Sequence, residues 1–330
     1  PGIRNAASVL PVVRNARDRS TRRLRATLTS FIRARHSGRS RPTRGSLVPT
    51  TRAARYPTRM PGPLVSLLTD FGTADPWVAI CKGVILGIAP DARLLDVSHD
   101  VPAFSVRAGA FVLAAALPEL PIGTHLAVVD PGVGTARRPV AVRAGRGDTL
   151  VGPDNGLLVA AAEALGGITA VHELQAPAFR RPGASHTFHG RDIFAPAAGH
   201  LAAGAPIEAF GPALPGDGLV RLLLPAPWVT SGALETAVLY VDRYGNLKLA
   251  GCDTDLRAAL GDPVPGTPLR LAWTDGDHVT TWGRTFADAP PGQSLLYRDS
   301  LGHLALAVNQ GSAAATLGLG PDTRLRIRRG

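Results

Sequence analysis

The sequence predicts an α/β N-terminal domain with a mostly parallel sheet, followed by a small all-β, barrel-like C-terminal domain. Two observations carry this prediction. Short apolar strands alternate with helical segments up to about residue 225, and this order is typical of parallel sheets covered by helices on both faces. After residue 232, short apolar runs separated by Gly, Asp and Pro turns follow one another with little helix, as in small β-barrels.

The first domain, residues 61–225, contains four expected strands and four expected helices. Apolar runs predict strands at 64–68, 93–97, 125–129 and 139–143. Helical spacing predicts helices at 77–88, 105–117, 155–165 and 190–203. Ser105 and Asn155 are the expected N-caps of two of them, because a short polar side chain can accept a free helix N–H. Pro196 is expected near the first turn of the last helix.

The second domain, residues 232–330, is expected to consist almost entirely of strands. They are predicted at 234–241, 269–273, 279–282, 295–297, 304–308 and 325–327. The boundary is placed at 225–232 because the Pro-Ala-Pro segment at 225–227 precedes the change of pattern.

The net charge of the whole chain differs in sign from that of the part expected to fold. The 330 residues carry a formal charge of +11, but residues 1–60 hold 15 Arg and a single acid, Asp18. The remaining residues carry about −3. No nucleic-acid partner is therefore expected from the charge of the folded part.

Residues 1–60 are rich in Arg, Ser, Thr and Pro and are predicted to be disordered. The only Met of the chain, Met60, stands where this stretch ends, and 34 Arg against 2 Lys indicate GC-rich coding. One hypothesis is that residues 1–59 are an untranslated upstream extension and that translation starts at Met60. The alternatives are a real disordered basic arm or a transit-like leader. The intact mass of the natively expressed protein distinguishes them.

Cysteine content and hydropathy indicate in which cellular compartment the protein is expected. Cys81 and Cys252 alone cannot form a disulfide framework or a zinc ribbon. No apolar run reaches the roughly 18 residues of a membrane span, and no secretory signal is recognisable. We therefore expect a cytoplasmic protein that makes no membrane contact.

Polar residues in turns are the candidate site residues. Phosphate-loop, zinc-protease and nucleophile-elbow motifs are absent from the sequence. His186 and His189 could share a metal ion, but no carboxylate or Cys cluster completes the set, so no metal is expected. Asp70 and Asp130 each follow a predicted strand, and ligands of open α/β sheets bind beyond the carboxyl ends of strands.

The order and spacing of these turns resemble those of the S-adenosylmethionine (SAM) hydroxide adenosyltransferases, which are relatives of the fluorinases and chlorinases. The similar segments are LLTDFG (67–72), CKGVILGIAPDA (81–92), VVDPGVGTARR (128–138), VGPDNGLL (151–158), TFHGRDIFAPAAGHLA (187–202), DRYGN (242–246) and GHLALAVNQGSAAATLGLG (302–320). Together they extend over about three quarters of the chain. One departure is Tyr244, where relatives usually have Phe.

The resemblance implies a function. The enzyme would hydrolyse SAM to adenosine and L-methionine by attack of water or hydroxide on ribose C5′. SAM would be the substrate, and no cofactor would be needed. The resemblance also implies a homotrimer, in which SAM lies between the N-terminal domain of one subunit and the C-terminal domain of the next.

By the same resemblance, the catalytic residues would be Asp130, Arg137 and His189. Asp130 would orient and deprotonate the water, and Arg137 would stabilise hydroxide character, with His189 close by. Arg138 is an alternative to Arg137. A second alternative is that the Asp and Arg form a purely structural ion pair.

Five residues would bind the substrate. Asp70 would accept hydrogen bonds from the ribose hydroxyls, because one carboxylate suits two neighbouring hydroxyl donors. Phe104 stands where halogenases place a Trp against the ligand, although simple core packing is an alternative. Asp242 would hold the methionine ammonium, Asn246 the adenine edge, and Ser300 would lie near the methionine carboxylate and adenine.

The sequence leaves two other functions open. A halogenase of the same fold would use a halide, but halogenases have Tyr where Asp130 stands. A carboxylate there would repel an anion by about 1–4 kcal/mol at 4 Å. The other possibility is a non-catalytic protein that binds SAM or adenosine.

Overall fold

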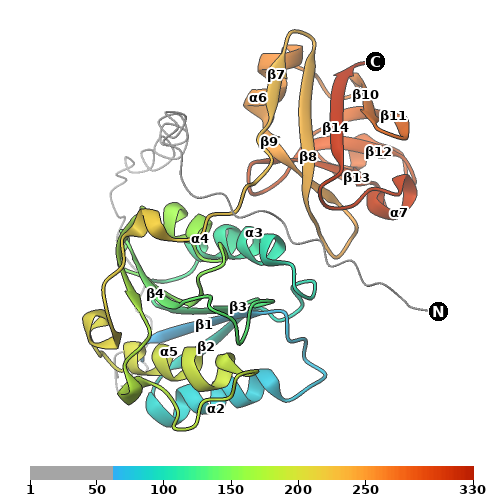
Figure 1. Cartoon of the computed structure of the whole chain (residues 1–330). Helices are drawn as coiled ribbons and strands as arrows, with labels where there is room; N and C mark the ends of the chain where they lie inside the picture. Colours follow the sequence, from blue (N-terminus) through green and yellow to red (C-terminus); the bar gives the residue numbers. More distant parts are fainter. Residues whose placement is uncertain (1–61) are drawn as a thin grey trace, which may run out of the picture. The chain divides into compact units, whose positions relative to one another are not determined.

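The computed structural model describes residues 62–330, so the expectations for residues 1–60 concern residues outside it. The described part contains a six-stranded sheet and an eight-stranded sheet (Figure 1). The first belongs to an α/β N-terminal domain and the second to an all-β C-terminal domain, which confirms the predicted fold class.

The six-stranded sheet has the order β2-β1-β3-β5-β4-β6. Its strands are β1 (Leu64–Thr69), β2 (Arg93–Ser98), β3 (Thr124–Val128), β4 (Pro139–Ala144), β5 (Thr149–Pro153) and β6 (Ile168–Glu173). The pairs β1–β2, β1–β3 and β3–β5 are parallel. Strand β4 runs antiparallel to both β5 and β6. The sheet is therefore parallel where the predicted site residues leave it and antiparallel at one side.

Helices cover both faces of this sheet (Figure 1). They are α2 (Trp77–Ile88), α3 (Val106–Ala116), α4 (Val159–Ala164), a π-helix (Gly190–Phe194) and α5 (Ala195–Ala202). Alternate residues of each strand point to opposite faces. Leu68 accordingly packs with α3 and α4, whereas Leu67 packs with α2 and α5. Two fully buried cores result, and they fix the position of the strand ends.

Most predicted elements agree with the structure, but one predicted cap is wrong. Ser105 caps α3 and accepts a hydrogen bond from the Ala108 N–H. Asn155, in contrast, does not cap α4, which begins at Val159. Its side chain instead accepts from the Leu157 N–H and donates to the Val129 carbonyl over 2.8 Å. Asn155 therefore ties a turn to the end of β3, directly before Asp130.

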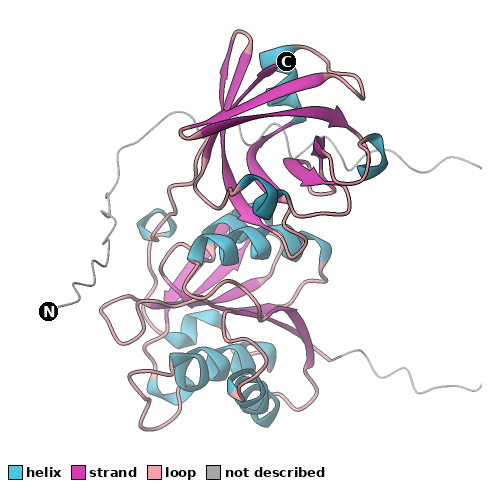
Figure 2. Cartoon of the chain, turned by 90° about the vertical axis from the view of Figure 1, so that its right-hand side faces the viewer, coloured by secondary structure: helices cyan, strands magenta, loops and turns pink. Residues whose placement is uncertain are grey.

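The C-terminal sheet closes into a seven-stranded barrel because β14 pairs with both β10 and β8. Its strands are β7 (Trp228–Thr230), β8 (Ala233–Val241), β9 (Leu247–Cys252), β10 (Pro268–Trp273), β11 (Gly276–Gly283), β12 (Ser294–Arg298), β13 (His303–Val308) and β14 (Arg324–Arg329). Strand β7 pairs outside the ring with β8. The helices are α6 (Asp253–Leu260) and α7 (Ala313–Leu317), and Figure 2 shows how strands dominate this part.

A buried polar network connects β1, β3 and the start of β5. Ser66 Oγ lies 2.7 Å from His125 Nδ1, and His125 Nε2 lies 2.9 Å from Asp148 Oδ1. The side chains of His125 and Asp148 are fully buried. Burial raises the pKa of Asp148, but hydrogen bonds from Arg146 and His125 outweigh it and lower that pKa overall.

We expect Asp148→Asn to lower the free energy of unfolding by about 3 kcal/mol, because breaking a buried charge pair leaves its partners uncompensated. Urea unfolding of the purified protein measures this. The matched control is Asp277→Asn, whose carboxylate pairs with Arg270 at the surface, 2.7 Å away. Exposed pairs contribute about 0–1 kcal/mol. Equal losses in the two variants would contradict the prediction.

Candidate active site

Two predicted site residues follow neighbouring parallel strands. Thr69, the last residue of β1, is in register with Val128, the last residue of β3. Asp70 comes directly after β1, and Asp130 follows β3 after one further residue. Both carboxylates therefore leave the sheet at the same carboxyl edge, where α/β proteins bind ligands.

Asp130 is held by Arg137 in a two-point ion pair. Arg137 Nε lies 3.0 Å from both Oδ1 and Oδ2 of Asp130, and Nη2 also contacts Oδ2. The side chains are only 6% and 9% exposed. The intervening turn needs Gly134, whose φ is +78° and where a Cβ would lie 2.8 Å from the His186 carbonyl oxygen. The turn thus brings the carboxylate and the guanidinium together in a largely dry environment.

His189 completes a row of three side chains. Its Nδ1 lies 2.7 Å from Arg137 Nη2, and His189 directly precedes the π-helix. The Arg137 guanidinium also stacks over the Phe194 ring at 5.1 Å. A guanidinium can only donate hydrogen bonds, so His189 Nδ1 accepts and the ring proton of the neutral form resides on Nε2.

Electrostatics keep His189 neutral. Burial lowers the pKa of His189 below its usual 6.5, and the charge of Arg137 lowers it further, while Asp130 opposes these effects in part. A second positive charge beside Arg137 is unfavourable, so the imidazole is uncharged near neutral pH.

Arg138 faces a different carboxylate. Its Nε lies 2.9 Å from Asp154 Oδ2, and its Nη2 donates to the Gly218 carbonyl at 2.7 Å. Asp154 also accepts a hydrogen bond from the Val220 N–H. The two consecutive arginines therefore separate into two ion pairs, and Arg137 is the one that faces Asp130.

Asp70 and Phe104 are in direct contact. The Phe104 N–H donates to Asp70 Oδ2 over 2.9 Å. Phe104 has a φ of +65°, and the residue is 73% exposed, so the alternative of core packing is wrong. A left-handed conformation costs a non-glycine residue about 1–3 kcal/mol, and residues strained in this way cluster at functional sites.

The predicted residues of the barrel domain form a second group. Asp242 accepts hydrogen bonds from the backbone N–H of Asn246 at 3.0 Å and from its Nδ2 at 2.9 Å. Lys248 Nζ lies 3.8 Å from Asp242 and 3.0 Å from Asp299, the residue before Ser300. Ser300 itself is exposed. Within residues 62–330, no hydrogen bond or ion pair joins this group to Asp130, Arg137 and His189.

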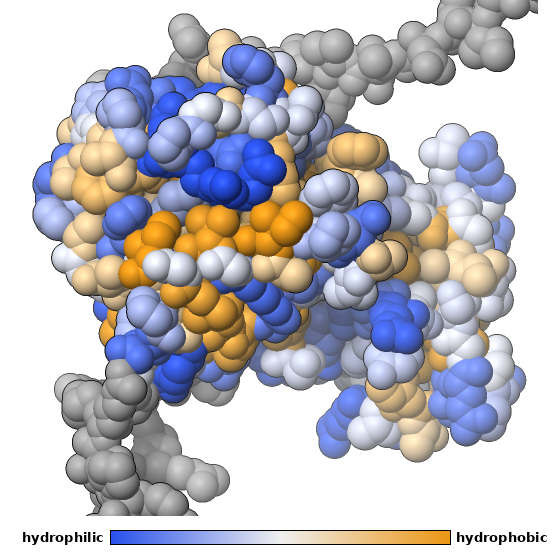
Figure 3. Space-filling model, turned by 90° about the horizontal axis from the view of Figure 1, so that it is seen from below, coloured by the Kyte–Doolittle hydropathy of each residue, from blue (hydrophilic) through white to orange (hydrophobic). Residues whose placement is uncertain are grey.

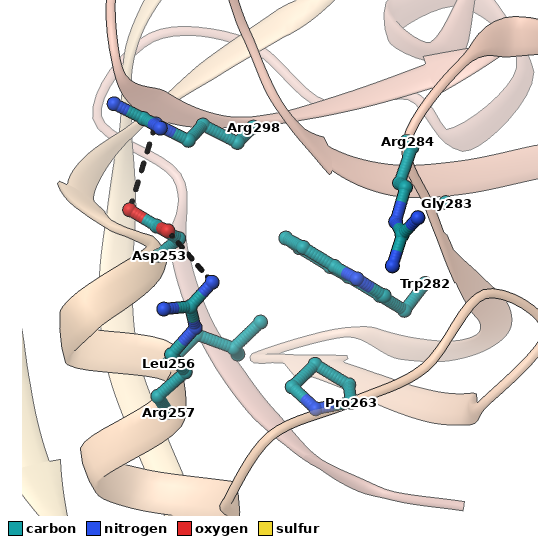
Figure 4. A pocket seen from close by; sticks show the side chains of 8 residues that line it. All are labelled: Asp253, Leu256, Arg257, Pro263, Trp282, Gly283, Arg284 and Arg298. Carbon is teal, nitrogen blue, oxygen red and sulfur yellow. Dashed lines mark ion pairs between the residues drawn. The ribbon is translucent and has the colours of Figure 1, made fainter.

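A separate pocket of about 230 Å³ lies in the barrel domain and contains none of the predicted site residues (Figure 4). Asp253 lies between two of its arginines, 3.3 Å from Arg257 Nη2 and 3.5 Å from Arg298 Nε. Trp282 and Pro263 form apolar parts of its wall (Figure 4). It has no counterpart of the Asp–Arg–His row.

Two residues near His189 were not predicted. Asp192 is buried in the π-helix and accepts from the Ser185 N–H at 2.9 Å and from Arg191 Nε at 2.7 Å, so it anchors the loop before His189. Arg180 donates to the Leu174 carbonyl, and its Nε is buried with no hydrogen-bond partner within the described residues. Asp192 lies inside a segment that the sequence marked, but no motif marks Arg180.

The arrangement suits activation of a water molecule. A carboxylate can accept a water proton, and an adjacent guanidinium stabilises developing negative charge. Within the described residues, no group of three or more His, Cys, Asp or Glu side chains could hold a metal ion. Over the same residues, no helix is both long and apolar enough to cross a bilayer.

Two features define the class of this protein. One is an α/β sheet with an Asp–Arg–His row at its carboxyl edge, and the other is the closed β-barrel that follows it in the sequence. The model of the SAM hydroxide adenosyltransferase N-terminal domain matches residues 65–211, and that of the C-terminal domain matches residues 236–326. The chain belongs to the SAM hydroxide adenosyltransferase family.

Individual relatives agree with this assignment. The chain is 48% identical to an (R)-S-adenosyl-L-methionine hydrolase of Salinispora arenicola, over 81% of this chain and 98% of that protein. It is 34% identical to a fluorinase of Actinoplanes, over 75% and 91%. An uncharacterized conserved protein of Thermotoga maritima, known from a crystal structure, is 32% identical with a TM-score of 0.74, over 80% and 100%.

Proposed function

We propose that this protein hydrolyses SAM to adenosine and L-methionine. The observation that carries the proposal is the contact of Arg137 with both Asp130 and His189 at the carboxyl edge of the sheet. The identity of 48% to an (R)-S-adenosyl-L-methionine hydrolase supports it.

In the proposed reaction, a water oxygen attacks ribose C5′ as the bond from C5′ to the sulfonium sulfur breaks. The bonding electrons go to sulfur, which leaves as the neutral thioether of methionine. Asp130 holds the water in line with the breaking bond and accepts its proton. Arg137 stabilises the hydroxide character of the oxygen. The leaving group is already positively charged, so it needs no acid and no cofactor.

We assign the substrate contacts as follows. Asp70 accepts hydrogen bonds from the ribose hydroxyls, and Phe104 covers the ligand from an exposed position beside it. The ammonium group of the methionine part binds Asp242, which is a carboxylate, while Asn246 binds the adenine edge. Ser300 lies near the methionine carboxylate.

A halide is a less suitable nucleophile than water in this site. The Asp130 carboxylate would face an incoming anion, and the repulsion amounts to about 1–4 kcal/mol for unit charges 4 Å apart. The lower identity of 34% to a fluorinase agrees with this preference. Product analysis in the presence of chloride or fluoride should give adenosine and no 5′-halo-adenosine.

The test of the proposed function is incubation of the purified protein with SAM, followed by chromatography of the nucleosides. We expect adenosine and methionine in equal amounts, above the slow uncatalysed background. Intact SAM after prolonged incubation would rule out the activity and leave a SAM-binding protein as the alternative.

We expect the rate to fall in acid. Protonated His189 can no longer accept the hydrogen bond from Arg137, and its pKa lies below the usual 6.5. The folded state therefore keeps His189 neutral, and kcat/KM should be level from about pH 6.5 upward and decline below it. His189→Gln should move or remove this acid limb. A decline that already begins above neutral pH would contradict the prediction.

We further propose that the active form is a homotrimer in the cytoplasm, with each site completed by the barrel domain of a neighbouring subunit. Helix α2 exposes Trp77 and Leu86 and has Lys82 as its only charged residue. Apolar residues also form a band on the face seen from below (Figure 3). Light scattering after gel filtration should give about three times the mass of one chain.

A further inference from the structure

His99 holds the turn after β1 at two points. Its Nδ1 lies 2.8 Å from Thr69 Oγ1, and its carbonyl oxygen accepts the Gly72 N–H at 2.8 Å. Thr69 Oγ1 also accepts the Phe71 N–H at 3.3 Å. Both ends of the segment between Thr69 and Gly72, which contains Asp70, are therefore fixed to one buried histidine.

The opposite side of the imidazole faces a charged pair. His99 Nε2 lies 3.0 Å from Asp96 Oδ1, and Lys82 Nζ of α2 lies 2.7 Å from Asp96 Oδ2. His99 Nε2 makes no hydrogen bond within the described residues, so its contact with Asp96 is mainly electrostatic. Burial raises the pKa of Asp96, but Lys82 and His99 outweigh it and lower that pKa overall.

These contacts favour one tautomer of the neutral imidazole. The Asp96 carboxylate attracts a proton on Nε2, which leaves Nδ1 as an acceptor. The Thr69 hydroxyl then donates to Nδ1, and its oxygen remains free to accept the Phe71 N–H. In the other tautomer, Nδ1 would donate to Thr69 Oγ1, and the Thr69 hydroxyl proton would have no acceptor among these contacts.

The turn contacts residues beside both the expected ribose contact and the Asp–Arg–His row. Asp70 accepts the Phe104 N–H at 2.9 Å, and both residues are assigned to the ribose side. The Phe71 ring meets the Phe188 ring edge-on at 6.0 Å, and Phe188 directly precedes His189. A displacement of this turn would therefore move the ribose contact and disturb the approach to the catalytic row.

We propose that His99 is a positioning residue for SAM, which sets the orientation of Asp70 through Thr69 without touching the substrate. This inference rests on the proposed function and extends it to a residue outside the assigned contacts. Loss of the Thr69 contact should weaken the binding of the ribose more than it slows the chemical step, because Asp70 binds substrate and transition state alike.

Two substitutions separate the two sides of the imidazole. In His99→Asn, the short amide reaches the place of Nδ1 and can keep the Thr69 contact. In His99→Gln, the longer amide reaches the place of Nε2 and keeps only the Asp96 contact. The matched control is His125→Asn, because His125 is another buried histidine of the N-terminal domain, and its side chain bonds Ser66 and Asp148 and no site residue.

We expect His99→Gln to raise the KM for SAM by about tenfold with a smaller change of kcat, and His99→Asn to recover most of this loss. His125→Asn should lower the melting temperature and leave KM unchanged. Equal KM values for the two His99 variants, or an equal rise in the His125 variant, would overturn the proposal.

Hydrogen exchange of the Phe71 and Gly72 amides is measured in the same variants, and this measurement does not depend on catalytic activity. His99→Gln should accelerate exchange of the Phe71 amide, and His99→Asn should restore most of its protection. If the unchanged enzyme forms no adenosine, the proposed function fails, and the exchange rates still decide whether His99 holds the turn. Equal exchange in both variants would overturn that role by itself.

Discussion

Asp130→Asn should lower the kcat for adenosine formation by about 10²–10⁴-fold, the usual contribution of a positioned general base. The amide keeps the size of the carboxylate and one oxygen for Arg137, so the turn should persist. It cannot take a proton from water, however, and it carries no charge. The dissociation constant for SAM, measured by calorimetry, should change only a few-fold.

The neighbouring ion pair provides a matched control. Asp154 pairs with Arg138 as Asp130 pairs with Arg137, and both carboxylates are almost fully buried. Asp154→Asn should therefore lose comparable stability, measured as melting temperature, while kcat stays within a few-fold of the unchanged enzyme. If both variants lost activity equally, the role of Asp130 would be structural.

Arg137→Lys should lower kcat by about 10²–10³-fold, the range seen when one group that stabilises a developing negative charge is removed. A lysine retains the charge but has no planar fork, so it cannot donate to Asp130 and to His189 Nδ1 in the present geometry. Stopped-time assays at saturating SAM separate this loss of kcat from any change in KM.

Arg138→Lys is the control for this substitution. Arg138 serves Asp154 and the Gly218 carbonyl, so a lysine there should affect folding stability and leave the chemical step nearly intact. A larger loss of kcat in Arg138→Lys than in Arg137→Lys would reverse the assignment of the two arginines.

The sequence was sufficient for the fold class because the periods of its apolar residues are local. Strands β1, β2 and β3 and helices α2 and α3 lie within a residue or two of their predicted positions. Strand β5 was not predicted, since its Gly and Pro residues and its short length obscure the strand pattern. Strand β6, Ile168–Glu173, was not predicted either, although it contains neither Gly nor Pro. Asn155 was taken for a cap because its bond to the Val129 carbonyl depends on the tertiary fold.

The candidate site also has features that the sequence predicts and features that only the structure shows. The motif order pointed to Asp130, Arg137 and His189, but only the structure shows that Arg137 contacts both of the others. The exposed, left-handed Phe104 could not be distinguished from a core residue by its letter alone. Arg180 was missed because its partner, the Leu174 carbonyl, belongs to no motif. His99 was missed because its partner, the Thr69 hydroxyl, is distant in the sequence.

The central claim is that a water molecule, activated at Asp130, attacks C5′ of SAM. Turnover in oxygen-18-labelled water, with mass spectrometry of both products, tests it directly. The mechanism predicts one labelled oxygen in the 5′-hydroxyl of adenosine and none introduced into methionine. Unlabelled adenosine, label in methionine alone, or a 5′-chloro-adenosine formed in chloride buffer would contradict it.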